Sequence, residues 1–206
     1  MAFELAFSGA AARVLQSEAA FSGHFSVRRL TLQHRLFAGG WSEPLVREVF
    51  ERGDAVAVLP YEPETDCVIL IEQFRPGALR DAHSPWMLEV IAGVVEAGET
   101  DAQVAHREAA EEAACELAEL LPIASYYPSA GACSEHVRLF CGRVTAADAG
   151  AVHGARDEGE DILVHRIPRA EALALLAADR VPNGHTLIAL QWLQLQGESL
   201  RQRWLS

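Results

Sequence analysis

The sequence contains no lysine, so all 17 of its Lys and Arg residues are arginine. This absence excludes mechanisms that need an ε-amino group, such as Schiff-base formation, attachment of pyridoxal phosphate and phosphate binding by the lysine of a P-loop. Positive charge is also scarce, because 29 Asp and Glu residues bring the formal net charge to −12. Sequence-independent binding to nucleic acid or to an anionic membrane depends on basic patches, so we expect neither partner.

Long hydrophobic runs and cysteine motifs are lacking as well. No run approaches the 18 apolar residues of a membrane span, and the apolar N-terminal stretch contains Glu4 and has no basic region before it, unlike a signal peptide. The four cysteines show no CxxC spacing and are too few for a disulfide framework. These absences predict a cytoplasmic protein. Its 206 residues are enough for one compact domain, or one domain with a smaller appendage.

The order of apolar and polar segments predicts strands first and helices later. Gly39-Gly40 forms a turn within a candidate small N-terminal sheet, and residues 61–66 form a turn-rich loop between two apolar strands. The expected strands are 25–37, 45–50, 55–59, 68–71, 87–91, 136–144 and 162–167, and the expected helices are 101–120, 169–178 and 185–195. Strands followed by interleaved helices indicate an α+β or mixed α/β sandwich.

The helix that begins near residue 101 carries the candidate chemistry. Thr100 and Gln103 have the spacing of a capping box, which fixes where the helix starts. Further along, residues three and four apart place Glu108, Glu111 and Glu112 on one face, where their charges repel. Such a face can be a solvated acidic surface, or it can hold a divalent cation.

Arg107 can pair with one of these carboxylates. It lies four residues before Glu111 and can pair with it. The pairing leaves Glu108 and Glu112 as oxygen ligands for Mg²⁺ or Mn²⁺, which prefer carboxylates.

A longer pattern surrounds these carboxylates. Gly93 is followed after five residues by Glu99, and after seven more by Arg107-Glu108 and then Glu111-Glu112. The segment AGVVEAGETDAQVAHREAAEEAAC therefore strongly resembles the signature of the Nudix hydrolases, which cleave nucleoside diphosphates linked to another group. One position departs from the family pattern, because Ala114 stands where the family has a glycine that helps the chain leave the helix.

The resemblance implies a fold and a metal site. The fold would be a Nudix-type α/β/α sandwich with a small N-terminal antiparallel sheet. By the same resemblance, the Ala92 carbonyl, Glu108 and Glu112 would bind the metal, Mg²⁺ or alternatively Mn²⁺. Arg107 and Glu99 would orient the helix and its loop, and Arg107 and Glu111 count among the candidate catalytic residues.

The resemblance extends over most of the chain. Within the family, the sequence is most similar in pattern to the ADP-ribose pyrophosphatase branch. The shared stretches are HRLFAGG, VREVFERGDAVAVLP, VILIEQFR, PWMLE, AGVVEAGE, SEH, HGARDEGEDI and LIALQWLQL. The resemblance implies a homodimer in which the N-terminal sheet, residues 1–52, reaches the partner and completes the active site of its catalytic domain, residues 53–206.

Further site residues follow from this branch. Arg47, Arg75 and Glu135 would contact the substrate, and the acidic loop 157–161 would supply the catalytic base, with Glu158 the first choice and Glu160 the second. The implied reaction is metal-dependent hydrolysis of ADP-ribose, or a related nucleoside diphosphate sugar, to AMP and ribose 5-phosphate by a water that a carboxylate activates.

Two other functions are compatible with the same residues. A GDP-sugar pyrophosphatase, for example one acting on GDP-mannose, would keep the motif, the metal and the dimer. A non-catalytic ADP-ribose sensor would usually have lost a metal carboxylate, whereas Glu108, Glu111 and Glu112 are all present. The enzyme is therefore favoured over the sensor.

Overall fold

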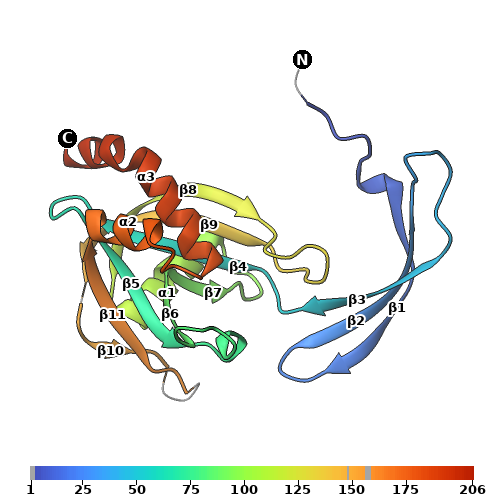
Figure 1. Cartoon of the computed structure of the whole chain (residues 1–206), viewed down its shortest axis with the longest axis horizontal. Helices are drawn as coiled ribbons and strands as arrows, with labels where there is room; N and C mark the ends of the chain where they lie inside the picture. The colour runs from blue at the N-terminus through green and yellow to red at the C-terminus, as the bar shows by residue number, and fades with distance from the viewer. Residues whose placement is uncertain (1–2, 148, 156–158) are drawn as a thin grey trace. The chain divides into compact units, whose positions relative to one another are not determined.

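The computed structural model describes residues 3–147, 149–155 and 159–206, and divides the chain into two compact units (Figure 1). Unit 1 consists of Met1–Gly53 and Tyr127–Glu135, and unit 2 consists of Asp54–Tyr126 and His136–Ser206. The expected mixed α/β class with a small N-terminal antiparallel sheet is confirmed.

Unit 1 is built on a three-stranded antiparallel sheet in the order β1-β2-β3. Its elements are η1 (Gly9–Ala11), β1 (Ala12–Ser22), β2 (Ser26–His34) and β3 (Leu45–Glu51). The expected strands 25–37 and 45–50 correspond to β2 and β3, whereas β1 was not predicted from the sequence. Every residue of β1 is exposed, so its side chains follow no alternation of buried and exposed positions that a pattern could reveal.

Unit 2 contains one mixed sheet of eight strands in the order β10-β11-β5-β4-β9-β8, with β6 beside β5 and β7 beside β4. Its strands are β4 (Ala55–Glu62), β5 (Cys67–Phe74), β6 (Trp86–Glu89), β7 (Ile91–Val94), β8 (Glu116–Tyr126), β9 (Val137–Ala146), β10 (Val152–His153) and β11 (Ile162–Pro168). Among the described strands of this sheet, β4 and β9 pair in parallel and the other pairs are antiparallel. The short helix η2 (Pro76–Ala78) follows β5.

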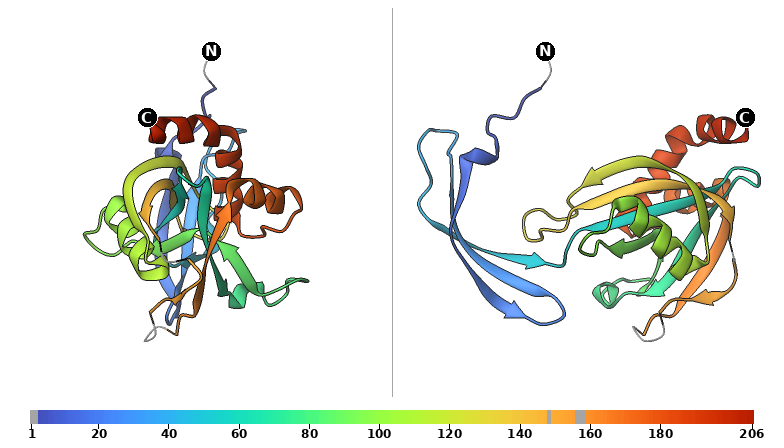
Figure 2. Two further views of the ribbon diagram at one scale, coloured as in Figure 1. Left: turned by 90° about the vertical axis from the view of Figure 1, so that its left-hand side faces the viewer. Right: turned by 180° about the vertical axis from the view of Figure 1, so that it is seen from behind.

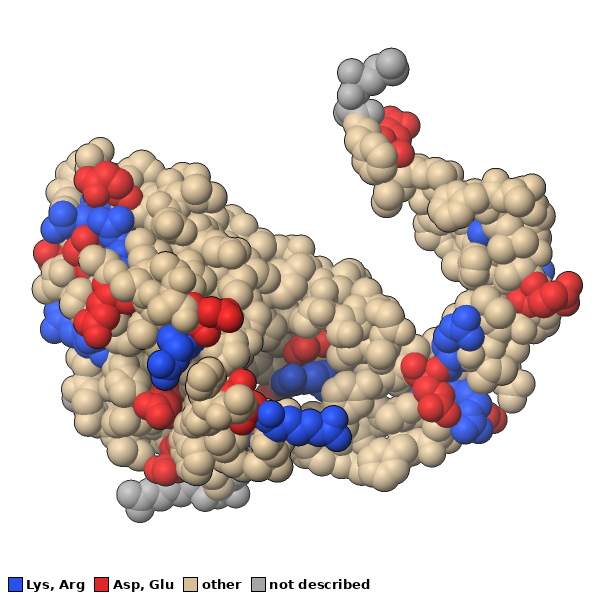
Figure 3. All heavy atoms as spheres, in the orientation of Figure 1, with Lys and Arg blue, Asp and Glu red and all other residues tan. Residues whose placement is uncertain are grey.

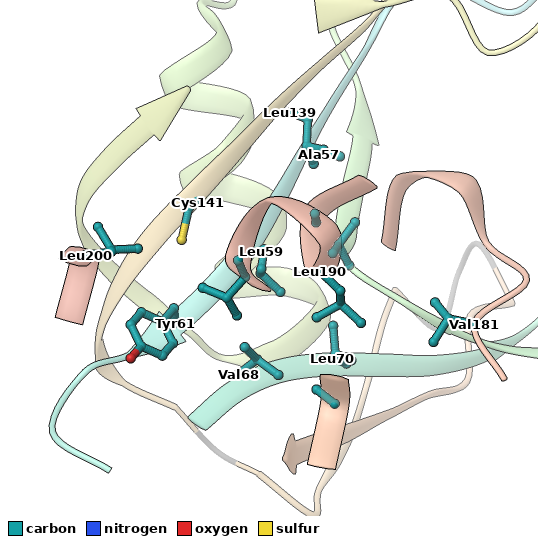
Figure 4. Packing of buried hydrophobic residues seen from close by; sticks show 14 of the residues in the cluster. Ala57, Leu59, Tyr61, Val68, Leu70, Leu139, Cys141, Val181, Leu190 and Leu200 are labelled. Carbon is teal, nitrogen blue, oxygen red and sulfur yellow. The ribbon is translucent and has the colours of Figure 1, made fainter. Parts of the chain in front are cut away.

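Helices cover both faces of this sheet (Figure 2). Alternate residues of β4 and β5 point to opposite faces, so one face packs on α1 (Asp101–Ala113) and the other on α2 (Arg169–Ala177) and α3 (Gly184–Leu205). Figure 4 shows the second face, where Leu59, Leu70 and Leu190 interlock. None of the helices in the described residues is long and apolar enough to cross a membrane.

The predicted helix 101–120 is too long. It ends at Ala113, because Ala114 takes a left-handed conformation (φ 44°, ψ 37°) and the backbone N–H groups of Ala114 and Cys115 bond back to carbonyls of the last turn. The next residues form β8, which pairs with β9. Ala and Glu favour helix locally, but pairing with a strand distant in sequence overrides that preference.

Two other predicted boundaries also shift. The apolar run 87–91 contributes to two strands, β6 and β7, rather than one. The last helix runs to Leu205, ten residues beyond the predicted end at 195.

Candidate active site

The start of α1 is fixed to the sheet of unit 2. The Thr100 hydroxyl accepts a bond from Gln103 N, and the Gln103 side chain accepts one from Thr100 N, so the predicted capping box is confirmed. Asp101 in the first turn accepts a bond of 2.7 Å from Arg138 Nε on β9. The helix therefore enters the site at a defined angle.

Arg107 ties the loop before α1 to the acidic face of the helix. Its Nε and Nη2 donate to Glu99 at 2.9 and 3.0 Å, which lowers the pKa of Glu99. Its Nη1 lies 2.7 Å from Glu108 and 3.4 Å from Glu111. The predicted pairing with Glu111 is present but is the longer contact, and Arg107 also neutralises part of the charge of Glu108. One arginine thus holds the loop and two helix carboxylates.

Glu108 and Glu112 lie against β7. A Cβ atom on Gly93 would be 1.6 Å from Glu108 Oε1, so only glycine leaves space for this carboxylate. Glu112 is 4% exposed, and its Oε2 accepts a bond of 3.2 Å from Ala92 N. The three predicted metal-binding positions, Ala92, Glu108 and Glu112, are therefore brought together, whereas Glu111 points into solvent with a side chain that is 58% exposed.

Burial, together with nearby negative charge, raises the pKa of both inner carboxyl groups. Burial raises the pKa of Glu112 to about 8, and the charges of Glu108 and Glu160 add to the effect. Burial also raises the pKa of Glu108, although Arg107 opposes the rise. One buried and one half-buried carboxylate that resist ionising side by side are a place where a bound cation would relieve repulsion.

The donor atoms at this place suit a hard divalent cation. Among the described residues, no group of three or more His, Cys, Asp or Glu side chains is arranged to hold a metal ion. Mg²⁺ typically uses only one or two protein carboxylates and keeps several waters. Glu108 and Glu112 meet that requirement.

Arg75 and Glu160 lie near these carboxylates. Burial, the largest effect on Arg75, lowers its pKa, but bonds and charge from nearby carboxylates, including Glu112 and Glu160, raise it overall. Glu160 accepts a bond of 2.9 Å from Ala155 N, which folds its side chain back onto the loop. Glu158, the first-choice base, lies outside the described residues.

Arg47 and Glu135 belong to unit 1. Arg47 lies on β3 and its Nη1 donates to Val46 O at 2.7 Å. Glu135 is 6% exposed and its Oε1 lies 3.3 Å from Arg52 Nε. These contacts of Arg47 and Glu135 are thus all with residues of unit 1.

Glu89 and Asn183 were missed as site residues by sequence reasoning. Glu89 is 4% exposed and binds Arg75 through both carboxylate oxygens. Asn183 donates to Glu89 at 3.0 Å. A glutamate inside the apolar run WMLEV was the signal available for Glu89, since an unpaired buried carboxylate is costly; Asn183 gave no comparable sign.

Basic and acidic side chains are mixed on one face of the protein. On the face shown in Figure 3, basic side chains lie next to acidic ones instead of forming a basic patch.

The sequence and the fold of this chain are similar to those of known proteins. The NUDIX domain matches residues 51–190. An ADP-ribose pyrophosphatase of Haemophilus influenzae is 41% identical over 201 residues, which is 96% of this chain and 93% of that one. A GDP-mannose pyrophosphatase of Klebsiella pneumoniae is 31% identical over 152 residues, covering 73% and 76%. A crystal structure described as an ADP compounds hydrolase is 22% identical, with a TM-score of 0.65 over 90% of this chain and 96% of that one, and shares the fold.

Proposed function

This chain belongs to the NUDIX domain family, and we propose that it hydrolyses the pyrophosphate bond of ADP-ribose to AMP and ribose 5-phosphate in a metal-dependent reaction. The observation that carries the proposal is the pair Glu108 and Glu112, held against Ala92 and Gly93. The ADP-ribose pyrophosphatase relative is more similar to this chain than the GDP-mannose pyrophosphatase is, and it matches more of the chain. This difference supports ADP-ribose as the proposed substrate.

Glu108, Glu112 and the Ala92 carbonyl would hold the divalent cation, Mg²⁺ or alternatively Mn²⁺. When bound, such an ion neutralises charge on a pyrophosphate and lowers the pKa of water. Arg107 keeps Glu108 beside the Glu99 loop. Glu111 is the exposed carboxylate of this face and would be accessible to substrate.

A glutamate of the acidic loop 157–161 would take the proton from the attacking water. Glu158 is our first choice and Glu160 the second. Glu160 is near enough to add to the raised pKa of Glu112, but its side chain already accepts a backbone bond from Ala155. That bond competes with proton transfer to Glu160, which keeps Glu160 the second choice.

Arginine residues would bind the phosphates. A guanidinium stays charged at all relevant pH values and can bind phosphate oxygens with two nitrogens. Arg75 lies by the helix carboxylates. Arg47 would contact the substrate from a neighbouring subunit if residues 1–52 are exchanged, and Glu135 would contact the substrate as well.

Exposed apolar side chains in unit 1 support such a homodimer. Val14, Leu15 and Phe21 of β1 are 58%, 50% and 60% exposed. A small sheet needs a covered apolar face for stability, so an isolated subunit would leave this sheet poorly supported. We therefore propose a homodimer in which residues 1–52 exchange between subunits; cytoplasmic location stays a prediction from the sequence.

Turnover of candidate substrates tests the function. We expect the wild-type protein with Mg²⁺ to release AMP from ADP-ribose faster than it cleaves GDP-mannose. Faster cleavage of GDP-mannose would favour the GDP-sugar alternative, and ADP-ribose binding without AMP release would favour the sensor.

Glu112→Gln tests the metal assignment. We expect a loss of turnover of at least about 100-fold, because the amide removes one of two anionic ligands. Glu116→Gln is the matched control, since Glu116 is an exposed glutamate at the start of β8. Near-wild-type turnover in Glu112→Gln would show that the metal assignment is wrong.

A further inference from the structure

Glu89 is a buried carboxylate that the family motif does not include, and it is bound from several sides. It lies on β6 and is 4% exposed. Its Oε2 accepts bonds from Arg75 Nη2 at 2.7 Å, Arg75 Nε at 3.0 Å and Gln73 Nε2 at 3.4 Å. Its Oε1 accepts a bond of 3.0 Å from Asn183 Nδ2. A buried carboxylate is tolerated when donors surround it in this way.

The bonds to Glu89 fix the plane of the Arg75 guanidinium. Two nitrogens, Nε and Nη2, are engaged, and Nη1 makes no hydrogen bond to any described residue. The side chain is still 44% exposed. Because the group is planar, holding two nitrogens also sets the direction of the third. Within the described part of the chain, Nη1 is therefore an oriented donor group of Arg75 with no partner.

Arg75 lies in a site that contains other negative charges besides that of Glu89. The negative charges of Glu112 and Glu160 act on Arg75, so both carboxylates are close enough to attract it. An arginine without its own partner in this acidic site would be drawn to the carboxylates that we assign to the cation. Pairing with Glu89 leaves those oxygens available.

Asn183 connects this pair to the start of α3. Its Oδ1 accepts bonds from Thr186 N at 3.0 Å and from Thr186 Oγ1 at 3.1 Å. Thr186 Oγ1 in turn accepts a bond of 2.9 Å from Val90 N. Since Oδ1 is used to cap the helix, the amide NH₂ group must face Glu89. The helix N-terminus thus orients the donor that supports the carboxylate.

We propose that Glu89 and Asn183 are positioning residues that hold Arg75 so that its Nη1 group binds a phosphate of the substrate. The role of a phosphate rests on the proposed pyrophosphate hydrolysis. The orienting of Arg75 itself rests only on the bonds described above. A pre-oriented guanidinium loses less conformational freedom on binding, and small misplacements of such groups are costly to catalysis.

Glu89→Gln tests the proposal by steady-state kinetics. We expect the variant to fold and kcat/KM for ADP-ribose to fall about 10- to 100-fold. Asn183→Ser keeps an oxygen that can cap α3 but removes the amide donor, and a smaller loss in the same direction is expected. Wild-type kcat/KM in Glu89→Gln would overturn the proposal.

A double-mutant cycle separates positioning from a general structural role. If Glu89 acts through Arg75, adding Glu89→Gln to the Arg75→Ala variant should lower kcat/KM little further. An equal fold-loss in both backgrounds would overturn the proposal. Asp66→Asn is the matched control, because it breaks another two-nitrogen bond to arginine, from Arg169 at 2.7 and 2.9 Å; its kcat/KM should stay at the wild-type value.

A spectrum without substrate decides the structural step independently. The Arg75 Nε–H signal in a ¹⁵N–¹H spectrum can be assigned by its loss in Arg75→Lys. We expect slow exchange with solvent in the wild type and fast exchange in Glu89→Gln. If the wild-type protein does not hydrolyse ADP-ribose, the proposed function fails, while this spectrum still shows whether Glu89 holds Arg75; equal exchange rates would overturn that as well.

Discussion

Glu108 passes so close over Gly93 that an added Cβ atom would lie 1.6 Å from its Oε1 and 2.5 Å from its Cγ. The obstacle involves most of the side chain, so a small rotation of the carboxylate cannot remove it. Gly93 is thus required here by the approach of a side chain from α1 and not by a left-handed backbone. The strand β7 and the helix α1 therefore pack closely at Gly93, where the Glu108 side chain occupies the space next to the glycine.

Gly93→Ala should therefore disable the site. The methyl group would displace Glu108 from β7, and we expect kcat/KM to fall by about 100-fold or more. Mg²⁺ titration should show weaker binding in the same variant. Gly9→Ala is the control, since a Cβ at Gly9 meets nothing within 4 Å. Unchanged Mg²⁺ affinity in Gly93→Ala would contradict the placement of Glu108.

Ala114→Gly should stabilise the protein. Ala114 has φ 44°, a left-handed conformation that costs an alanine about 1 to 2 kcal/mol, and glycine recovers that cost less the entropy it loses on folding. We expect the free energy of unfolding in denaturant to rise by about 0.5 to 1 kcal/mol. Ala110→Gly, at an exposed helical position, should lower it by about 1 kcal/mol. Destabilisation by Ala114→Gly would show that the helix end is wrongly described.

Local signals in the sequence were enough to predict the start of α1 and the grouping of its carboxylates. Capping and the pairing of Arg107 with Glu111 depend on residues at most four apart, so spacing determines them. The predicted end of the helix was wrong because β8 is stabilised by pairing with β9. The helix propensity of Ala and Glu in 114–120 carries no information about that pairing. Glu119, placed in that predicted helix, instead accepts a bond from Trp204 on α3.

The contact between Arg75 and Glu89 shows the same limit within the site. The two residues are fourteen apart and meet because β5 and β6 pair antiparallel, with Phe74 opposite Trp86. The sequence indicated both strands but not that they are neighbours. Residues that support a site from adjacent strands therefore become visible only when the sheet order is known.

Asp66→Asn should change the stability of the protein in a pH-dependent way. Bonds from Arg169 lower the pKa of Asp66 below its usual value. The unfolded chain then takes up the proton first as the pH falls, so this carboxylate stabilises the folded state above pH about 4 and loses its contribution in more acidic solution. Near neutrality, we expect the free energy of unfolding of the wild type to exceed that of the variant by about 1 to 2 kcal/mol. The difference should shrink below pH about 4.

Asp179→Asn is the matched control for this measurement. Asp179 has a similar left-handed φ, 56° against 57°, but is exposed and forms no ion pair with a described residue. Denaturant unfolding at several pH values should give nearly the same curve as the wild type. A constant difference between Asp66→Asn and wild type at every pH would contradict the role of the Arg169 pair.

Mixing two inactive variants should restore activity if the N-terminal sheet is exchanged. Arg47 lies in unit 1 and Glu112 in unit 2, so in an exchanged dimer each site takes Arg47 from one subunit and Glu112 from the other. A heterodimer of Arg47→Ala and Glu112→Gln then contains one unaltered site and one doubly altered site. After unfolding and refolding of an equal mixture, we expect about one quarter of wild-type turnover, since half of the dimers are mixed and half of their sites are intact. Each variant refolded alone is the control, and the mass in solution should be that of two chains. Turnover no greater than the mean of the two variants would show that Arg47 and Glu112 of one subunit serve the same site.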